Sequence, residues 1–89
     1  MGRLTLYGRE RCHLCEEMHE DIQVWLRRAG ALDQVRLDEV DVDSRPELIA
    51  AYGARVPVLV DAGGQEICDV RFDADAFCAW WEAAGHRSL

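Results

Sequence analysis

The chain has 89 residues, a length that supports one hydrophobic core and therefore one domain. Its formal net charge is −7, and its ten basic residues are all arginines scattered along the sequence. Without a basic stripe, the composition excludes an electrostatic binder of nucleic acid and gives no reason to expect an anionic membrane as a partner. Hydrophobic residues make up 49% of the chain, too many for a disordered protein.

Neither a membrane span nor a secretory signal is expected. No run approaches the roughly 20 apolar residues that cross a bilayer, and the first residues lack the basic and apolar regions of a signal peptide. We therefore expect a cytoplasmic protein, in a compartment where thiols stay reduced. In such a chain, a closely spaced cysteine pair indicates a redox or metal site rather than a structural disulfide.

The first expected elements are a strand and a long helix. Residues 4–7 alternate between the two faces of a strand, and Gly8 ends it. From residue 13, apolar side chains recur every three or four residues, which is typical of one buried helix face. Gly30 supplies the stop at the helix C-terminus. The apolar positions are Leu14, Met18, Ile22, Trp25, Leu26 and Ala29.

A second strand is expected over residues 35–42. Its apolar side chains alternate in two halves that are one position out of phase. This pattern predicts a bulge near Asp38-Glu39, or a strand that covers only part of the run. A short helix should follow, with Ser44 and Glu47 as a capping box and Pro46 in its first turn.

Two further strands are expected at residues 57–60 and 66–71, joined by a turn. Pro57 can only begin a strand, and the turn between the two returns the chain in the antiparallel direction. The last element is a helix capped by Asp73, with Phe72 and Phe77 as a hydrophobic staple. The order β-α-β-α-β-β-α predicts a single α/β domain spanning residues 1–89.

Cys12 and Cys15 are the candidate catalytic residues. They stand where the first strand meets the helix, and the N–H groups and dipole at a helix N-terminus stabilise a thiolate. A thiolate is the form that attacks a disulfide. We expect Cys12, at the exposed tip, to be the nucleophile. Cys15, one turn inside the helix, would resolve the mixed disulfide and close an active-site disulfide with Cys12.

His13 is a candidate tuning residue. As a cation it would favour a thiolate on Cys12. Glu10, Glu16 and Glu17 act in the opposite direction, so the sign of the net effect on the pKa of Cys12 does not follow from the sequence. A solvated His13 without a role is the alternative.

A metal centre is the alternative use of the same cysteines. Cys12, Cys15, His13 and His19 are ligand types that zinc accepts. A second CxxC or HxxxH pair is missing, however, so we expect no bound metal. Copper-carrying domains of the ferredoxin-like type also place a CxxC after the first strand, but they require the order β-α-β-β-α-β.

The sequence resembles the thioredoxin superfamily, and within it the small glutaredoxin-like proteins of bacteria. A CxxC pair alone is a weak signal, but CxxC after the first strand with Val-Pro opening the third is a specific one. The residues that carry the resemblance are Leu4-Thr5-Leu6-Tyr7, Cys12-His13-Leu14-Cys15, Val40-Asp41-Val42-Asp43, Pro46-Glu47-Leu48 and the run 52–60. The resemblance implies a thioredoxin-like fold: a four-stranded mixed sheet with the first and last helices on one face and the middle helix on the other.

The resemblance also implies an activity. Cys12 and Cys15 would reduce protein or low-molecular-weight disulfides, in cell redox homeostasis and electron transport. The Val56–Pro57 bond would be cis, and the Val56 backbone would pair with the bound thiol substrate. The protein would act as a monomer, without a bound cofactor, on disulfide-containing proteins or with glutathione as co-substrate.

Three departures from the family pattern bear on the substrate. His13-Leu14 stands where glutaredoxins commonly have Pro-Tyr, Arg55 where they have Thr before the Val-Pro, and Arg71-Phe72 where they have Gly-Gly. A glycine pair at the last position lets a glutathione backbone approach closely. Whether glutathione binds is therefore open.

One acidic position and one basic position still fit a glutathione site. Asp75 matches the acidic residue that meets the glutathione amine, and Arg9 or Arg11 would replace the lysine that meets a carboxylate. Cys68 is expected to be a buried structural residue, and Cys78 a packed or half-exposed one. A thioredoxin-type fold kept as a partner-binding adaptor, with thiols that do not turn over, is the remaining alternative.

Overall fold

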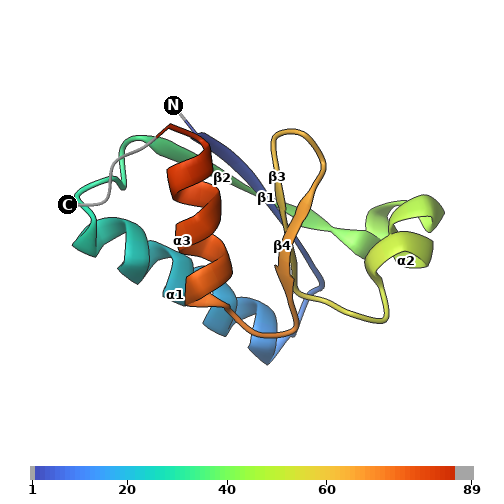
Figure 1. The fold of residues 1–89 in the computed structure, drawn as a ribbon. Helices are drawn as coiled ribbons and strands as arrows, with labels where there is room; N and C mark the ends of the chain where they lie inside the picture. Colours follow the sequence, from blue (N-terminus) through green and yellow to red (C-terminus); the bar gives the residue numbers. More distant parts are fainter. Residues whose placement is uncertain (1, 86–89) are drawn as a thin grey trace.

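The computed structural model describes residues 2–85. The elements are β1 (Gly2–Gly8), α1 (His13–Arg28), β2 (Val35–Asp41), the 3₁₀ turn η1 (Val42–Ser44), α2 (Pro46–Tyr52), β3 (Val58–Asp61), β4 (Glu66–Asp69) and α3 (Ala74–Ala83) (Figure 1). This succession confirms the predicted α/β order, with η1 as one added turn. In the part of the chain that the structure describes, no helix is long and apolar enough to cross a membrane.

The four strands form one mixed sheet in the order β2-β1-β3-β4. β1 runs parallel to β2 and antiparallel to β3, and β3 runs antiparallel to β4. Tyr7 pairs with Val58, and Gly8 pairs with Asp41. The chain leaving β1 therefore emerges at the same edge of the sheet as the chain entering β3 and the chain leaving β2.

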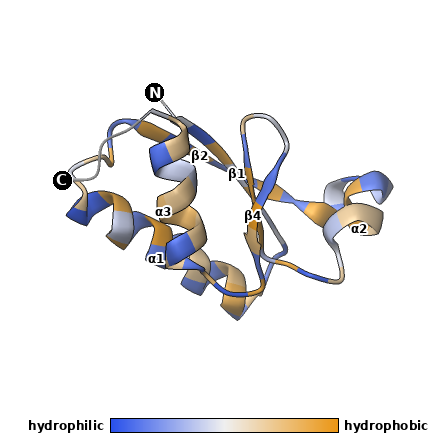
Figure 2. Ribbon diagram, viewed as in Figure 1, coloured by the Kyte–Doolittle hydropathy of each residue, from blue (hydrophilic) through white to orange (hydrophobic). Residues whose placement is uncertain are grey.

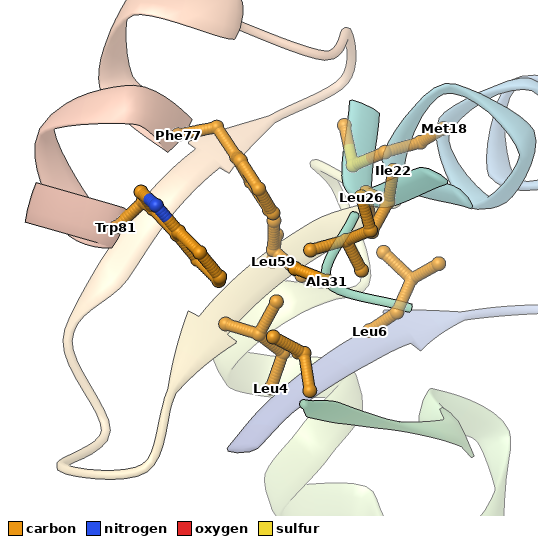
Figure 3. Close-up of a cluster of buried hydrophobic side chains, with 10 residues drawn as sticks. Leu4, Leu6, Met18, Ile22, Leu26, Ala31, Leu59, Phe77 and Trp81 are labelled. Atoms are coloured by element: carbon orange, nitrogen blue, oxygen red, sulfur yellow. The ribbon is translucent and has the colours of Figure 1, made fainter. Parts of the chain in front are cut away.

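The hydrophobic core lies between one face of the sheet and the pair α1 and α3, which cross that face together (Figure 1). Figure 3 shows the strand residues of this face pointing toward the helix residues. Trp25 of α1 meets Phe77 of α3 edge to face, with ring centroids 4.8 Å apart. The core residues shown there are Leu4, Leu6, Met18, Ile22, Leu26, Ala31, Leu59, Phe77 and Trp81.

The opposite face of the sheet receives α2. Neighbouring strand residues point to opposite faces, so Tyr7 points away from the buried Leu6. The ring of Tyr7 stacks on Tyr52 of α2, with centroids 4.3 Å apart and planes 17° apart. The predicted placement of the middle helix on the other face is therefore confirmed.

Helix α1 follows from the sequence pattern. Its buried residues Met18, Ile22 and Leu26 are spaced four apart, and Figure 2 shows hydrophilic and hydrophobic residues mixed along its ribbon. Basic side chains in its last turn complement the helix dipole. Gly30, at φ +68°, then turns the chain away, as expected of a glycine at this position.

The bulge predicted near Asp38-Glu39 is wrong. β1 and β2 pair without a register shift from Gly2↔Val35 to Gly8↔Asp41. The change of phase arises because both faces of β2 carry apolar side chains, Leu37 on the α1 face and Val40 on the face of Tyr7. The irregular register lies instead between β3 and β4.

The capping box predicted for α2 is also wrong. Ser44 belongs to η1 and donates a hydrogen bond to the Asp41 carbonyl at 2.6 Å. The residue that precedes α2 is Arg45, which provides no side-chain cap, while Pro46 occupies the first turn as predicted. The reason is that the Asp41 carboxylate accepts the Asp43 N–H and opens a separate turn before the helix.

The last helix begins as predicted. The Asp73 carboxylate accepts the Ala76 N–H at 3.0 Å, and the rings of Phe72 and Phe77 lie 5.4 Å apart. β4, however, ends at Asp69 rather than at residue 71. Val70 has φ +64°, which takes the chain out of the extended conformation.

Candidate active site

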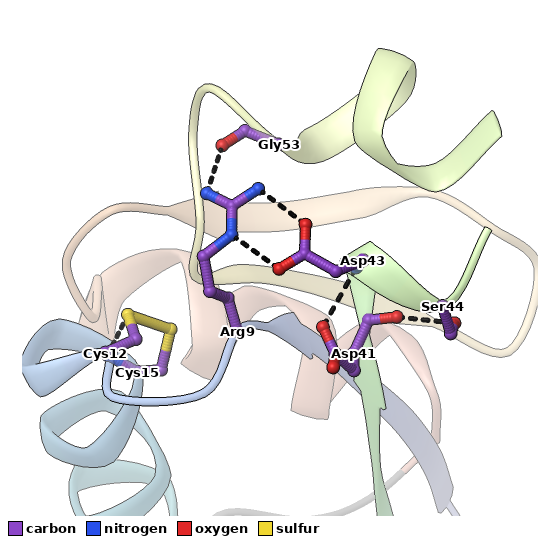
Figure 4. A network of polar contacts seen from close by, with 7 residues as sticks. All are labelled: Arg9, Cys12, Cys15, Asp41, Asp43, Ser44 and Gly53. Carbon is purple, nitrogen blue, oxygen red and sulfur yellow. Dashed lines mark hydrogen bonds and ion pairs between the residues drawn. A yellow bond between two sulfur atoms is a disulfide. The ribbon is translucent and has the colours of Figure 1, made fainter. Parts of the chain in front are cut away.

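Cys12 and Cys15 are joined by a disulfide at the N-terminus of α1 (Figure 4). Cys12 is the cap residue, with an extended backbone, and its sulfur accepts the Cys15 N–H at 3.2 Å. Their Cα atoms are 5.2 Å apart, and both residues are half-buried. The structure thus unites the two predicted residues at the positive end of a helix, where a Cys12 thiolate would be stabilised once the disulfide is reduced.

Gly8, the last residue of β1, lies against the side chain of Cys15. A Cβ atom at Gly8 would lie 3.0 Å from the Cys15 sulfur and 3.3 Å from the Cys15 Cβ. A side chain at the last residue of β1 would therefore force Cys15 to shift by a few tenths of an ångström. The sequence predicts Gly8 only as the end of a strand, and its place shortly before the CxxC pair is the one signal of this close approach.

Arg9 holds the loop before Cys12 in place. Its guanidinium donates to both carboxylate oxygens of Asp43, at 3.1 and 3.2 Å, and to the Gly53 carbonyl at 3.1 Å (Figure 4). The hydrogen bond with Asp43 raises the pKa of Arg9 above its ordinary value. These contacts occupy the Arg9 guanidinium, and a contact between Arg9 and a glutathione carboxylate stays a prediction.

The Val56–Pro57 peptide bond is cis, as predicted. Pro57 is buried directly before β3, at the sheet edge from which the Cys12 loop also emerges. The Pro57 carbonyl accepts the Val70 N–H at 2.8 Å, which ties the turn after β4 to the cis bond. Val70 and Leu14 line one shallow groove, so this turn lies close to the first turn of α1.

Arg55, one of the departures from the family pattern, also has a positional role. It donates to Glu66 at 2.6 Å, to Asp69 at 2.9 Å and to the Ala51 carbonyl at 3.0 Å. These bonds connect the segment before Val56 to both α2 and β4. The hydrogen bond from Arg55 lowers the pKa of Glu66.

His13 and Arg11 both lie on the exposed surface. The His13 side chain is 84% exposed, and its ring nitrogens lie 3.9 Å from carboxylate oxygens of Glu16 and Glu17. This placement agrees with the alternative of a solvated residue, and a tuning role stays a prediction. Arg11 has φ +57° and lines a groove beside the disulfide.

The groove beside the disulfide has a volume of about 350 Å³. Both cysteines and Arg11 line it, while Asp75 does not. Asp75 is exposed in the first turn of α3. The structure therefore brings together Cys12, Cys15 and Arg11, and it leaves Asp75 outside this groove.

The turn before α3 contains Arg71-Phe72, the pair compared above with the glycine pair of glutaredoxins. Phe72 packs on the core against Phe77, and Val70, not Arg71-Phe72, adopts the left-handed backbone conformation that favours glycine. Val70 is 38% exposed beside the site. Nothing in the sequence indicated this, because valine is a strand former.

No cluster of three or more His, Cys, Asp or Glu side chains with metal-binding geometry occurs among residues 2–85. His19 lies 3.6 Å from Glu39 on β2. The chain also lacks the β-α-β-β-α-β order of the ferredoxin-like copper carriers. The fold therefore differs from the one that the metal-carrier alternative required.

Cys68 and Cys78 are free thiols away from the disulfide. Cys68 packs against the core, as expected, and its burial raises the pKa of the thiol. Cys78 donates to Glu82 at 3.4 Å, and this hydrogen bond raises the pKa of Cys78. Both thiols are consequently weaker nucleophiles at neutral pH than an unperturbed cysteine.

Comparison with known proteins places this geometry in a family. The Glutaredoxin-like domain (DUF836) matches residues 3–82. Protein Ne2328 from Nitrosomonas europaea is 34% identical, with a TM-score of 0.76 over 89% of each chain. Target protein XcR50 from X. campestris is 44% identical, with a TM-score of 0.66 over 98% of this chain and 100% of that one.

More distant structures share the fold alone. Thioredoxin 1 from Thermosipho africanus is 16% identical, with a TM-score of 0.58 over 93% of this chain and 98% of that chain. No curated protein sequence matches. The fold and the Cys12–Cys15 pair together support a function of redox type. The chain belongs to the Glutaredoxin-like domain (DUF836) family, a small glutaredoxin-like branch of the thioredoxin superfamily with a thioredoxin-like fold.

Proposed function

We propose that the protein is a dithiol-disulfide oxidoreductase that reduces protein or low-molecular-weight disulfides. The observation that carries this proposal is the Cys12–Cys15 disulfide at the N-terminus of α1, at the same sheet edge as the cis Val56–Pro57 bond. The helix N-terminus favours a thiolate on Cys12, and the spacing of the two cysteines lets them open and close a disulfide.

The reaction proceeds in two exchanges. The Cys12 thiolate attacks one sulfur of the substrate disulfide, so that a mixed disulfide forms and the other substrate sulfur leaves and takes a proton. Cys15 then loses its proton and attacks the Cys12 sulfur, which releases the second substrate thiol. Two electrons pass from the protein to the substrate, and the protein ends with its Cys12–Cys15 disulfide. An external thiol must reduce that disulfide again.

Substitution of each cysteine tests the mechanism. Cys12→Ser should abolish reduction of 2-hydroxyethyl disulfide, and Cys15→Ser should accumulate the mixed disulfide on Cys12. Trypsin cleavage after Arg11 and Arg27 puts both cysteines in one peptide, apart from Cys68 and Cys78, and mass spectrometry of that peptide identifies each species. Cys78→Ser is the matched control and should turn over normally. Turnover by Cys12→Ser would refute the mechanism, whereas a lack of turnover in the unsubstituted protein would favour the adaptor alternative.

We also propose that the protein works as a monomer in the cytoplasm, in cell redox homeostasis, on disulfide-containing proteins. Its net charge of −7 and scattered arginines support a partner other than nucleic acid or an anionic membrane. Glutathione is a candidate reductant of the Cys12–Cys15 disulfide. Arg11 beside the disulfide supports this role, whereas the position of Asp75 outside the groove does not. The peptide analysis above, repeated with oxidised glutathione, would detect glutathione on Cys12.

A further inference from the structure

The groove beside the disulfide carries an excess of negative charge. Four carboxylates line it together with the two cysteines: Glu10, Glu16, Glu39 and Asp41. Of its two arginines, Arg9 is already neutralised by Asp43, a fifth carboxylate. Only Arg11 is left to offset the other four.

The sheet register places two of these carboxylates on the same face of the sheet as Gly8. In a parallel pair, partner residues point to the same face, and Gly8 pairs with Asp41 while Leu6 pairs with Glu39. A Cβ at Gly8 would meet the Cys15 sulfur, so this face of β1 is the one that supports the disulfide. Asp41 and Glu39 therefore flank the disulfide from the β2 side.

The remaining carboxylates approach from the other side and are well exposed. Glu10 precedes the cysteines, and Glu16 lies on α1 with its side chain 79% exposed. His19 lies 3.6 Å from Glu39 and His13 lies 3.9 Å from Glu16, and each offsets its carboxylate only when protonated. A groove lined mainly by one sign of charge raises the local concentration of oppositely charged ligands and repels the same sign.

We propose that this groove makes the reduced Cys12–Cys15 pair select disulfides flanked by positive charge, such as a protein disulfide beside Lys or Arg, over anionic disulfides. The inference rests on the proposed function and names its substrate class. In each turnover the two protein thiols supply two electrons and two hydrogens, the substrate S–S bond breaks, and the Cys12–Cys15 bond forms. Glutathione disulfide carries net negative charge, so it belongs to the disfavoured class.

Three small symmetrical disulfides that differ in charge test the inference: cystamine, a dication; 2-hydroxyethyl disulfide, neutral; and 3,3′-dithiodipropionate, a dianion. The reduced full-length chain, freed of reductant, reacts with each in a single turnover at about 0.02 M and about 0.5 M salt, where screening differs strongly. Acid quenching and mass spectrometry follow closure of the Cys12–Cys15 disulfide. Rates with dithiothreitol, a neutral dithiol, correct for the intrinsic reactivity of each disulfide.

The corrected rate for the dication should exceed that for the dianion by about ten-fold or more at low salt, and the ratio should fall toward one at high salt. Glu39→Gln and Glu16→Gln should each lower the ratio. Any effect of these changes on the Cys12 thiolate cancels, because it applies to all three disulfides. Asp33→Asn is the matched control, because it removes one exposed charge beyond the far end of α1, a 16-residue helix about 24 Å long.

Three outcomes overturn the inference. A corrected ratio of one or less at low salt would show that the groove does not select by charge. An equal loss of preference in Asp33→Asn and Glu39→Gln would assign the effect to net charge rather than to the groove. If not even the neutral disulfide closes the Cys12–Cys15 bond, the proposed function itself fails, and the inference fails with it.

Discussion

At the scale of single residues, the site combines a pair set by local spacing with neighbours set by distant contacts. Cys12 and Cys15 were predictable as a pair because three residues of separation at a helix start bring two sulfurs together. Gly8 and Val70 were not, because their roles depend on what the folded chain places beside them. Neither the glycine beside the Cys15 sulfur nor the valine in a left-handed turn changes the spacing of apolar residues, so the sequence pattern does not reveal them.

Val70 gives a prediction about stability. A β-branched residue at φ +64° is strained, by about 1–2 kcal/mol for left-handed backbone, while its side chain is 38% exposed, so its removal also loses some packing. Val70→Gly should change the free energy of unfolding by less than about 1 kcal/mol, because relief of the strain offsets both the lost packing and glycine's greater freedom in the unfolded chain. Urea unfolding of the oxidised protein measures it.

Val70→Ala is the matched control for this prediction. Alanine removes the same methyl groups but keeps a Cβ, and therefore most of the left-handed strain. We expect Val70→Ala to be less stable than Val70→Gly. If the two variants are equally stable, the backbone of Val70 stores no strain and the methyl groups alone account for any change.

At the scale of elements, the regular pattern was predictable and the tertiary links were not. The apolar spacing of α1 identified Met18, Ile22 and Leu26 because a buried helix face repeats every three to four residues. The same reasoning predicted a bulge in β2. Apolar side chains on both faces of a strand give the same change of phase in the sequence as a bulge does. Arg9 and Asp43 are 34 residues apart, and nothing local in the sequence connects them.

The Arg9 contact predicts a coupled change in two loops. Three hydrogen bonds from one guanidinium connect the loop before Cys12 to η1 and to Gly53 after α2. Arg9→Gln should therefore increase amide hydrogen exchange by about ten-fold or more both in residues 9–12 and in residues 53–56. Arg9→Lys should not restore protection, because an ammonium cannot reproduce the bidentate fork. Exchange followed by mass spectrometry gives both segments in one experiment.

The control for this prediction is Arg3→Gln. Arg3 forms one ion pair with Asp38, at 3.5 Å, on an exposed part of the sheet away from the cysteines. Its loss should leave exchange in both loops unchanged. Faster exchange of only one loop in Arg9→Gln would show that the two loops are not held together by this side chain.

At the scale of the whole molecule, a chain with a net charge of −7 uses its arginines to hold carboxylates on the sheet. Arg55 lowers the pKa of Glu66, and Arg36 lowers the pKa of Asp38, in each case first through a hydrogen bond. Both carboxyl groups release their protons more readily in the folded than in the unfolded protein. Their contribution to stability is therefore complete above the ordinary values of 4.5 and 3.8, and it is lost as the pH falls through the lowered folded values.

Arg55→Gln should consequently destabilise the protein at pH 7 and lose less stability than the wild type as the pH falls below about 4.5. The free energy of unfolding, measured in urea between pH 7 and pH 3, should give two curves that converge at the acid end.

Arg45→Gln removes the same charge from an exposed residue that has no ion pair within residues 2–85, so its curve should stay parallel to that of the wild type. The comparison separates the local bonds of Arg55 from the general effect of net charge, since both variants become more acidic by one unit. Parallel curves for Arg55→Gln and the wild type would mean that Glu66 titrates alike in the folded and unfolded chains. The hydrogen bonds of Arg55 to α2 and β4 would then not depend on the charge of Glu66.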